Sequence, residues 1–109
     1  MSAIARGGVD NVLSPHGRPS PRSCRTPGVY KTVAITRRVF IEGNPIVLVG
    51  DPMEAHPDPA INCGLHAPTL SSGSSRIFYQ GVAIGRIGDS YDQNGVHPII
   101  SGSSRCFSN

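Results

Sequence analysis

GSSRIFYQGVAIGRIGD, residues 73–89, contains the pattern from which the architecture of this chain is predicted. It begins with a turn of small residues and continues in a strand rich in β-branched and aromatic side chains, residues 76–80. Gly81 then marks a tight turn into a second apolar run, which ends at Gly88 and Asp89. The stretch therefore predicts a small β-hairpin unit.

The same unit occurs elsewhere in the chain, and an internal repeat determines the architecture. Residues 38–51 repeat residues 76–89 with a constant offset of 38 residues, which relates Phe40 to Phe78, Gly43 to Gly81 and Asp51 to Asp89. Residues 102–107 repeat residues 73–78, and residues 4–10 resemble 84–89. We therefore expect one all-β domain, 1–109, with repeat units of approximately 1–51, 52–89 and 90–109, the N-terminus completing the last unit.

Three motifs resemble the PAAR-repeat family, whose members form the conical tips of contractile injection machines. They are GRIGD at 85–89, CGLH at 63–66 and the GSSR turns at 73–76 and 102–105. The family's Pro-Ala-Ala-Arg signature is reduced here to VAIGR at 82–86, and Val9 is inserted before the Asp of the first copy. The resemblance implies a compact conical domain of three short hairpins with pseudo-threefold symmetry, whose loops converge at a metal-pinned tip.

The resemblance also implies a function. Such a tip caps and sharpens the trimeric β-helical spike protein of a phage tail or type VI secretion machine, with one tip chain per trimer, and helps to pierce the target envelope. The implied location is the virion tail tip or the secretion-machine tip, after assembly in the bacterial cytoplasm. Contact with the target-cell outer membrane would be transient.

Composition predicts a turn-rich β protein with a thin core. The chain has 109 residues with 13 Gly, 10 Pro and no Trp, and 38% of its residues are hydrophobic. Such a core usually needs a staple, for example a metal. The net charge of +3 comes without a nucleic-acid-binding motif, so we expect no nucleic-acid partner. The three cysteines follow no signal peptide, which argues against a secreted disulfide framework. No apolar run approaches the ~20 residues of a membrane-spanning helix.

Three stretches, the first two rich in proline, are expected to be loops between the hairpins. They are residues 11–27, 52–68 and 90–98. Residues 32–41 are predicted to be a strand region, and residues 1–10 are predicted to add a short strand to a neighbour.

Each expected loop contains at least one histidine, which is the main indication of a metal site. If the loops converge, His and Cys side chains meet and suit a closed tetrahedral zinc site, iron being the less favoured metal. The predicted ligands are His16, Cys63, His66 and His97, with His56 and Cys24 as substitutes. Against this, a lone loop histidine is usually solvent-exposed, and Cys63 alone could be a small buried hydrophobe.

Other residues are expected to be structural. Phe40, Phe78 and Phe107 occupy equivalent positions and are predicted to bury against one another, and Cys106 is predicted to be a core residue. Asp51 and Asp89 are expected to cap turns.

No catalytic motif is found, so an enzyme is not expected. The alternatives are a small zinc hydrolase or deaminase, with Glu54 as the only acid near the ligands, a type VI adaptor for effectors, and a metal-free β-solenoid adaptor.

Overall fold

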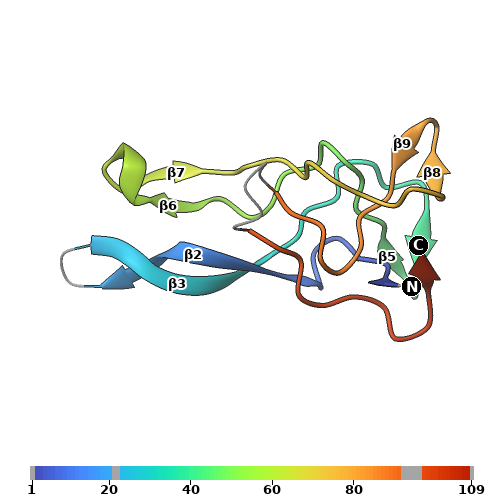
Figure 1. The fold of residues 1–109 in the computed structure, drawn as a ribbon, viewed down its shortest axis with the longest axis horizontal. Coiled ribbons are helices and arrows are strands. Elements are labelled where there is room, and N and C mark those ends of the chain that lie inside the picture. Colours follow the sequence, from blue (N-terminus) through green and yellow to red (C-terminus); the bar gives the residue numbers. More distant parts are fainter. Residues whose placement is uncertain (1, 21–22, 92–96, 109) are drawn as a thin grey trace.

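Ten short β-strands and one 3-10 turn form the chain in a computed structural model that describes residues 2–20, 23–91 and 97–108. The molecule is elongated, with principal extents of 42 × 23 × 22 Å (Figure 1). The described residues contain no α-helix, which confirms the all-β prediction, and none of their helices is long and apolar enough to cross a membrane. The strands pair into five separate two-stranded antiparallel sheets.

Three short hairpins lie at one end of the molecule (Figure 1). We call these hairpins, together with segments 4–6, 46–48 and 84–86, the base. Two of them turn at Glu42-Gly43 and Gln80-Gly81, where all four residues have positive φ, as a tight two-residue turn requires. The third pairs the two ends of the chain, which confirms that residues 1–10 add a short strand; Met1 itself lies outside the described residues. The hairpins are β4–β5 (Phe40–Ile41 and Asn44–Pro45), β8–β9 (Phe78–Tyr79 and Val82–Ala83) and β1–β10 (Ser2–Ala3 and Phe107–Ser108).

A closed cycle of backbone hydrogen bonds joins the three segments of the base. The N–H of Ala5 donates to the carbonyl of Gly85 at 3.0 Å, Gly85 donates to Val47 at 2.7 Å, and Val47 donates back to Ala5 at 3.3 Å. A Cβ on Gly85 would lie 2.8 Å from Leu70 Cδ2, so the cycle closes around a residue without a side chain. Buried polar backbone groups are thereby satisfied although no regular sheet connects the segments.

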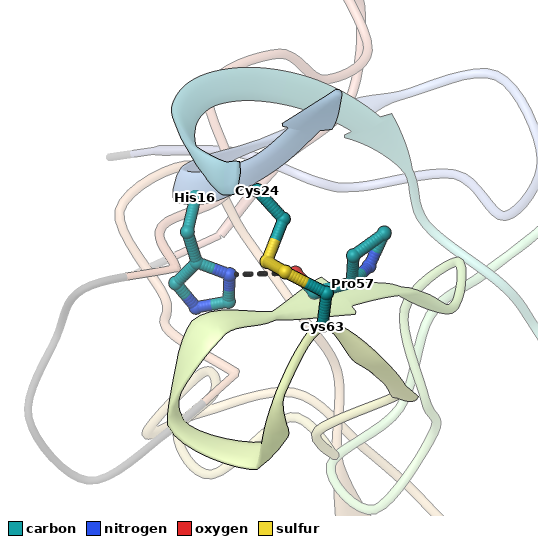
Figure 2. Close-up of a disulfide and its surroundings, with 4 residues drawn as sticks. All are labelled: His16, Cys24, Pro57 and Cys63. Atoms are coloured by element: carbon teal, nitrogen blue, oxygen red, sulfur yellow. Dashed lines mark hydrogen bonds between the residues drawn. A yellow bond between two sulfur atoms is a disulfide. The ribbon is translucent and has the colours of Figure 1, made fainter. Parts of the chain in front are cut away.

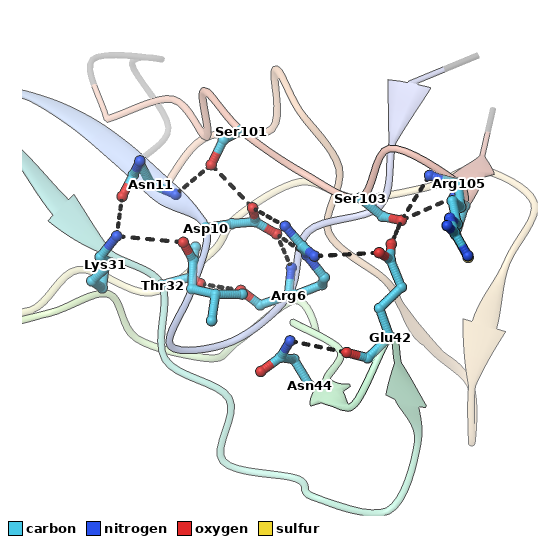
Figure 3. A network of polar contacts seen from close by, with 12 residues as sticks. Arg6, Asp10, Asn11, Lys31, Thr32, Glu42, Asn44, Ser101, Ser103 and Arg105 are labelled. Carbon is cyan, nitrogen blue, oxygen red and sulfur yellow. Dashed lines mark hydrogen bonds and ion pairs between the residues drawn. The ribbon is translucent and has the colours of Figure 1, made fainter.

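An aspartate follows each of these segments, and its carboxylate accepts a hydrogen bond from a backbone N–H of the segment. The carboxylate of Asp51 accepts from the Leu48 N–H at 2.9 Å, and that of Asp89 accepts from the Arg86 N–H at 2.8 Å. The expected turn-capping roles of both residues are therefore confirmed. Asp10 takes the third position, one residue later because of the inserted Val9, and accepts from the Arg6 N–H at 2.6 Å (Figure 3).

The Asp10 carboxylate is also the centre of a polar network that spans the chain (Figure 3). It pairs with the Arg6 guanidinium at 3.0 Å and accepts from Ser101 Oγ at 3.0 Å. The Arg6 guanidinium lies 3.8 Å from Glu42, whose carboxylate accepts a hydrogen bond from Ser103. This arrangement raises the pKa of Arg6, mainly through its hydrogen bond to Asp10. Segments from the beginning, middle and end of the sequence are thus held together.

The core of the base is aliphatic, and the prediction that the three phenylalanines form it is wrong. Phe40, Phe78 and Phe107 are 50%, 54% and 46% exposed. Side chains alternate between the two faces of a strand, so the neighbours of the phenylalanines point inward instead. These inward neighbours pack against a buried cluster of Ile4, Ile46, Leu48 and Ile84; they are Val39, Ile41, Tyr79 and Cys106. Phe40 and Phe78 do take corresponding places in the hairpins β4–β5 and β8–β9, but the buried face is displaced by one residue. Cys106, predicted to be a core residue, is only partly buried and packs at the edge of the core.

Two longer hairpins extend from the base as an arm, and they correct the prediction of loops at 11–27 and 52–68 (Figure 1). The first pairs β2 (Asn11–Ser20) with β3 (Ser23–Lys31), and residues 21–22 lie outside the described residues. The second pairs β6 (His56–Asp58) with β7 (Gly64–His66) across the 3-10 turn η1 (Pro59–Ile61). Proline is tolerated in β2–β3 because a register shift lies between the pairs Ser14↔Gly28 and Arg18↔Thr26.

Two further expectations concern the segments between base and arm. Within the predicted strand region 32–41, Thr32 forms an isolated bridge to Met53 and only Phe40–Ile41 is a strand. In the third expected loop, residues 92–96 lie outside the described residues, and Ser90 forms an isolated bridge to Pro98.

Candidate metal centre

All four histidines of the chain converge where the two hairpins of the arm face one another. One ring nitrogen from each of His16, His56, His66 and His97 lies within 4.8 Å of the others. His16 belongs to β2, whereas His56 begins β6 and His66 ends β7 as a directly opposite cross-strand pair. His97 adjoins the bridge between Ser90 and Pro98. The histidines are therefore close enough to bind one metal ion.

The Nδ1 atoms of three of these rings face oxygen acceptors. Nδ1 of His16 lies 3.0 Å from the carbonyl oxygen of Pro57, and Nδ1 of His56 lies 3.0 Å from that of Glu54. Nδ1 of His66 lies 3.3 Å from a carboxylate oxygen of Asp58. Carbonyl and carboxylate oxygens accept hydrogen bonds, so we assign the ring proton of each neutral imidazole to Nδ1.

This assignment leaves the Nε2 atoms of the three rings as lone-pair donors. Nε2 of His56 lies 2.6 Å from Nε2 of His66 and 3.2 Å from Nε2 of His97. With this assignment the Nε2 atoms of His56 and His66 face each other as two lone pairs, which cannot form a hydrogen bond but can both bind a cation placed between them. Metal-binding histidines typically donate their second N–H to a carbonyl or carboxylate, as these three do. The donor set thus fits a metal ion, with His16, His56, His66 and His97 as the ligands.

Burial favours the uncharged form that a metal needs. His56 has no exposed surface, and His97 is only 2% exposed. Desolvation lowers the pKa of His56, and the nearby His66, His97 and His16 rings act in the same direction. The ring of Tyr30 stacks on His56 with a centroid distance of 4.7 Å and an interplanar angle of 24°. His56 is therefore held as a neutral, oriented imidazole before any ligand arrives.

Cys63 is not a member of this cluster, which corrects the predicted ligand set. It forms a disulfide with Cys24, so neither sulfur is available as a thiolate ligand (Figure 2). The chain thus contains one disulfide, although the cysteine pattern argued against a secreted disulfide framework, and Cys106 is a free thiol. The predicted ligands His16, His66 and His97 do come together, and His56, considered only as a substitute, takes the fourth position.

The role of His56 depends on pairing that the sequence pattern did not indicate. It faces His66 because residues 56–58 and 64–66 pair as strands, with Pro57 opposite Leu65 and Asp58 opposite Gly64. A signal was present: two histidines ten residues apart, on either side of a turn-forming segment, can face each other in a hairpin. The proline-rich composition of 52–68 concealed it.

No model of a known protein family matches the chain, and no curated protein matches it.

Proposed function

We propose that this protein is the metal-pinned tip of a contractile injection machine, capping a trimeric spike. The observation that carries the proposal is the position of the histidine cluster. It joins the two hairpins of the arm, and this arm extends away from the three short hairpins of the base (Figure 1). A point that is crosslinked internally and a base suited to a partner are the two parts that a tip needs.

The metal we propose is zinc. Four neutral imidazoles form a borderline-soft nitrogen donor set, and zinc accepts four protein ligands in tetrahedral structural sites. With four side chains supplying the donors, the ion would crosslink β2, β6, β7 and the segment of His97. Iron is the alternative, and elemental analysis of the purified protein distinguishes the two metals.

A structural role is supported more strongly than the alternative of a zinc hydrolase. A catalytic zinc keeps one position for water or substrate, whereas four histidines would occupy all positions of a tetrahedral ion. The acid considered for catalysis, Glu54, uses its side chain elsewhere: its carboxylate accepts a hydrogen bond from the Lys31 N–H at 3.0 Å. The adaptor role for effectors shares the same tip geometry and differs only in what else is bound.

The base supports the proposed partner. Phe40, Phe78 and Phe107 are exposed at corresponding positions of the three short hairpins, around the closed backbone cycle. In each case an exposed arginine stands two residues before the phenylalanine in the sequence. Three similar surfaces on one chain match the three equal subunits of a trimer, which is the pseudo-threefold arrangement that we propose. Apolar side chains in such a setting are typical of an interface.

The test is reconstitution with the trimeric spike protein, followed by native mass measurement. We expect one tip chain for each spike trimer. Phe78→Ala should weaken the complex at least tenfold because a buried aromatic is a typical interface hot spot. Leu65→Ala is the matched control, since Leu65 is also exposed but lies on β7 of the arm.

Two outcomes would overturn the proposed docking mode. A complex of three tip chains with three spike chains would mean that each chain binds one spike subunit separately. Equal weakening by Phe78→Ala and Leu65→Ala would mean that the base is not the interface.

A further inference from the structure

The two hairpins of the arm belong to separate sheets. Among the described residues, β2 pairs with β3 and β6 pairs with β7, and the further bridge of β2, from Val12 to Ile99, does not reach the β6–β7 hairpin. At the root of the arm the Glu54 N–H donates to the carbonyl of Lys31 at 2.9 Å, and farther out the described contacts between the hairpins are made by side chains and by the Cys24–Cys63 disulfide. A sheet ladder would resist separation along its whole length, whereas point contacts of this kind can open once the strongest is broken.

The disulfide and the histidine cluster connect the same two hairpins. Cys24 lies on β3 and Cys63 precedes β7, while His16 lies on β2 and His56 and His66 lie on β6 and β7. In Figure 2 the disulfide lies beside His16 and Pro57, whose carbonyl oxygen holds the His16 ring at 3.0 Å. Separation of His16 from the His56–His66 pair would open the site, and it would move the two hairpins apart because His16 lies on β2 and the pair lies on β6 and β7.

The chain around Cys63 would relax if the bond were broken. Asn62 and Cys63 have φ angles of 56° and 63°, in the left-handed region that is unfavourable for residues other than glycine. The Cys63 N–H donates to the carbonyl of Asp58 at 2.8 Å, so the same short turn also carries the carboxylate that faces His66. Cleavage of the disulfide would therefore loosen the residues that orient the metal ligands.

Resting on the proposed metal centre, we infer that the Cys24–Cys63 disulfide is a redox-controlled lock on the metal ion. With the bond intact, the hairpins stay together and the metal dissociates slowly. With the bond reduced, β2–β3 can swing away from β6–β7 and release the metal. Cys24 is only 3% exposed, whereas Cys63 is exposed, so a reductant reaches the bond from the Cys63 side.

A water-soluble trialkylphosphine is a suitable reductant. Its phosphorus attacks the sulfur of Cys63, the S–S bond breaks, and Cys24 leaves as a thiolate that takes a proton from water. Water then hydrolyses the thiophosphonium ion to the phosphine oxide and the Cys63 thiol. The protein gains two electrons and two protons, and the phosphine is oxidised.

The experiment measures zinc release from the loaded full-length chain into an excess of a chromogenic chelator, with and without the phosphine. We expect reduction to accelerate release at least tenfold. The variant Cys24→Ser/Cys63→Ser should release zinc as fast as the reduced protein and should not respond to the phosphine. Cys106→Ser is the matched control, because Cys106 is the free cysteine, and it should behave like the unchanged protein in both states.

The outcomes separate the inference from the proposal on which it rests. Equal release rates before and after reduction, in a protein that binds zinc, would overturn the lock and leave the metal centre standing. Three reactive thiols instead of one in the untreated native protein would also overturn it, because the disulfide would be absent. A protein that takes up no metal in either state would overturn the proposed metal centre itself. If the double variant does not fold, reduction of the loaded native protein still decides the question.

Discussion

The base and the arm are both built from β-hairpins, yet they are held together by different kinds of interaction. In the base, buried aliphatic side chains, a cycle of backbone hydrogen bonds and three aspartate caps join segments from all parts of the chain. In the arm, two hairpins without a shared sheet are joined by a disulfide and a cluster of four histidines. We therefore expect the base to keep its structure without a metal, and the arm to depend on the proposed metal and on the disulfide.

The difference shows how a small domain can form a narrow projection. An apolar core needs surrounding layers, and a narrow structure has too few residues to supply them. Crosslinks do not need layers, since they act between single atoms. In the narrow arm, crosslinks between single side chains thus take the place of an apolar core.

Metal removal should have the largest effect and should separate the two regions. At a free zinc concentration 1,000-fold above Kd, binding stabilises a folded protein by about 4 kcal/mol. Addition of a chelator should therefore lower the free energy of unfolding by about this amount. Hydrogen exchange should show faster exchange at residues 12–20, 23–30 and 56–66, while the amides of Ala5, Val47 and Gly85 stay protected. Uniform loss of protection across both regions would contradict the distinction.

Leu70→Ala should cause the next largest loss in the free energy of unfolding, and this loss should not depend on metal. Leu70 is 1% exposed and belongs to the buried cluster next to the backbone cycle. Removal of a buried leucine side chain costs about 3 kcal/mol through lost burial and the cavity that remains. Denaturant unfolding should give the same loss with zinc and with chelator present. If the free energy of unfolding fell only in the zinc-loaded protein, Leu70 would stabilise the arm and not the base.

Acid should weaken the metal-free arm before it weakens the base. Burial lowers the pKa of His56 in the folded protein below its ordinary value of 6.5. The unfolded state then binds the proton more readily, so stability is full above pH 6.5 and falls as the pH drops toward the folded pKa. One such group changes the free energy of unfolding by at most about 1.4 kcal/mol per pH unit. In His56→Asn the free energy of unfolding should change less between pH 5 and 7 than in the unchanged protein. An equal change with pH in the two proteins would contradict the role assigned to His56.

Gly43→Ala and Gly81→Ala should have small and nearly equal effects. Both glycines have a φ of +82° in the turns of β4–β5 and β8–β9, and no atom lies within 4 Å of an added Cβ. The cost is therefore conformational only, about 1 kcal/mol each. Thermal unfolding of the two variants compares the turns directly. A large difference between them would show that the two hairpins are not equivalent.

The sequence predicted the base well because its information there is local and repeated. The pairs Phe40 and Phe78, Gly43 and Gly81, and Asp51 and Asp89 mark turns and caps whose chemistry acts within a few residues. The pairing of the chain ends followed from the same repeat. The inward face of each strand could not be predicted from the repeat, since a shift by one residue keeps every motif and exposes the other face.

The arm was harder to predict because its contacts are distant in sequence and depend on register. Cys63 and His66 fit a metal-binding motif, but whether a cysteine binds metal or another cysteine depends on what lies opposite, here Cys24. His56 gained its role from pairing across a turn in a stretch whose prolines argued against any strand. The histidines in each predicted loop nevertheless indicated a metal site, and three of the four predicted ligands meet there.

The β1–β10 hairpin joins segments that are far apart in the sequence, whereas each of the other two hairpins of the base is closed by a two-residue turn. Ser2 faces Ser108, just as Ile41 faces Asn44 across a closed turn. A short glycine-containing linker between the ends would close the chain into a ring, and the chain could then be opened at Glu42-Gly43 or Gln80-Gly81. Such circular permutants would keep every side chain of the core and of the histidine cluster. We therefore expect each of the three hairpins of the base to accept an attached carrier, which would emerge on the side away from the arm.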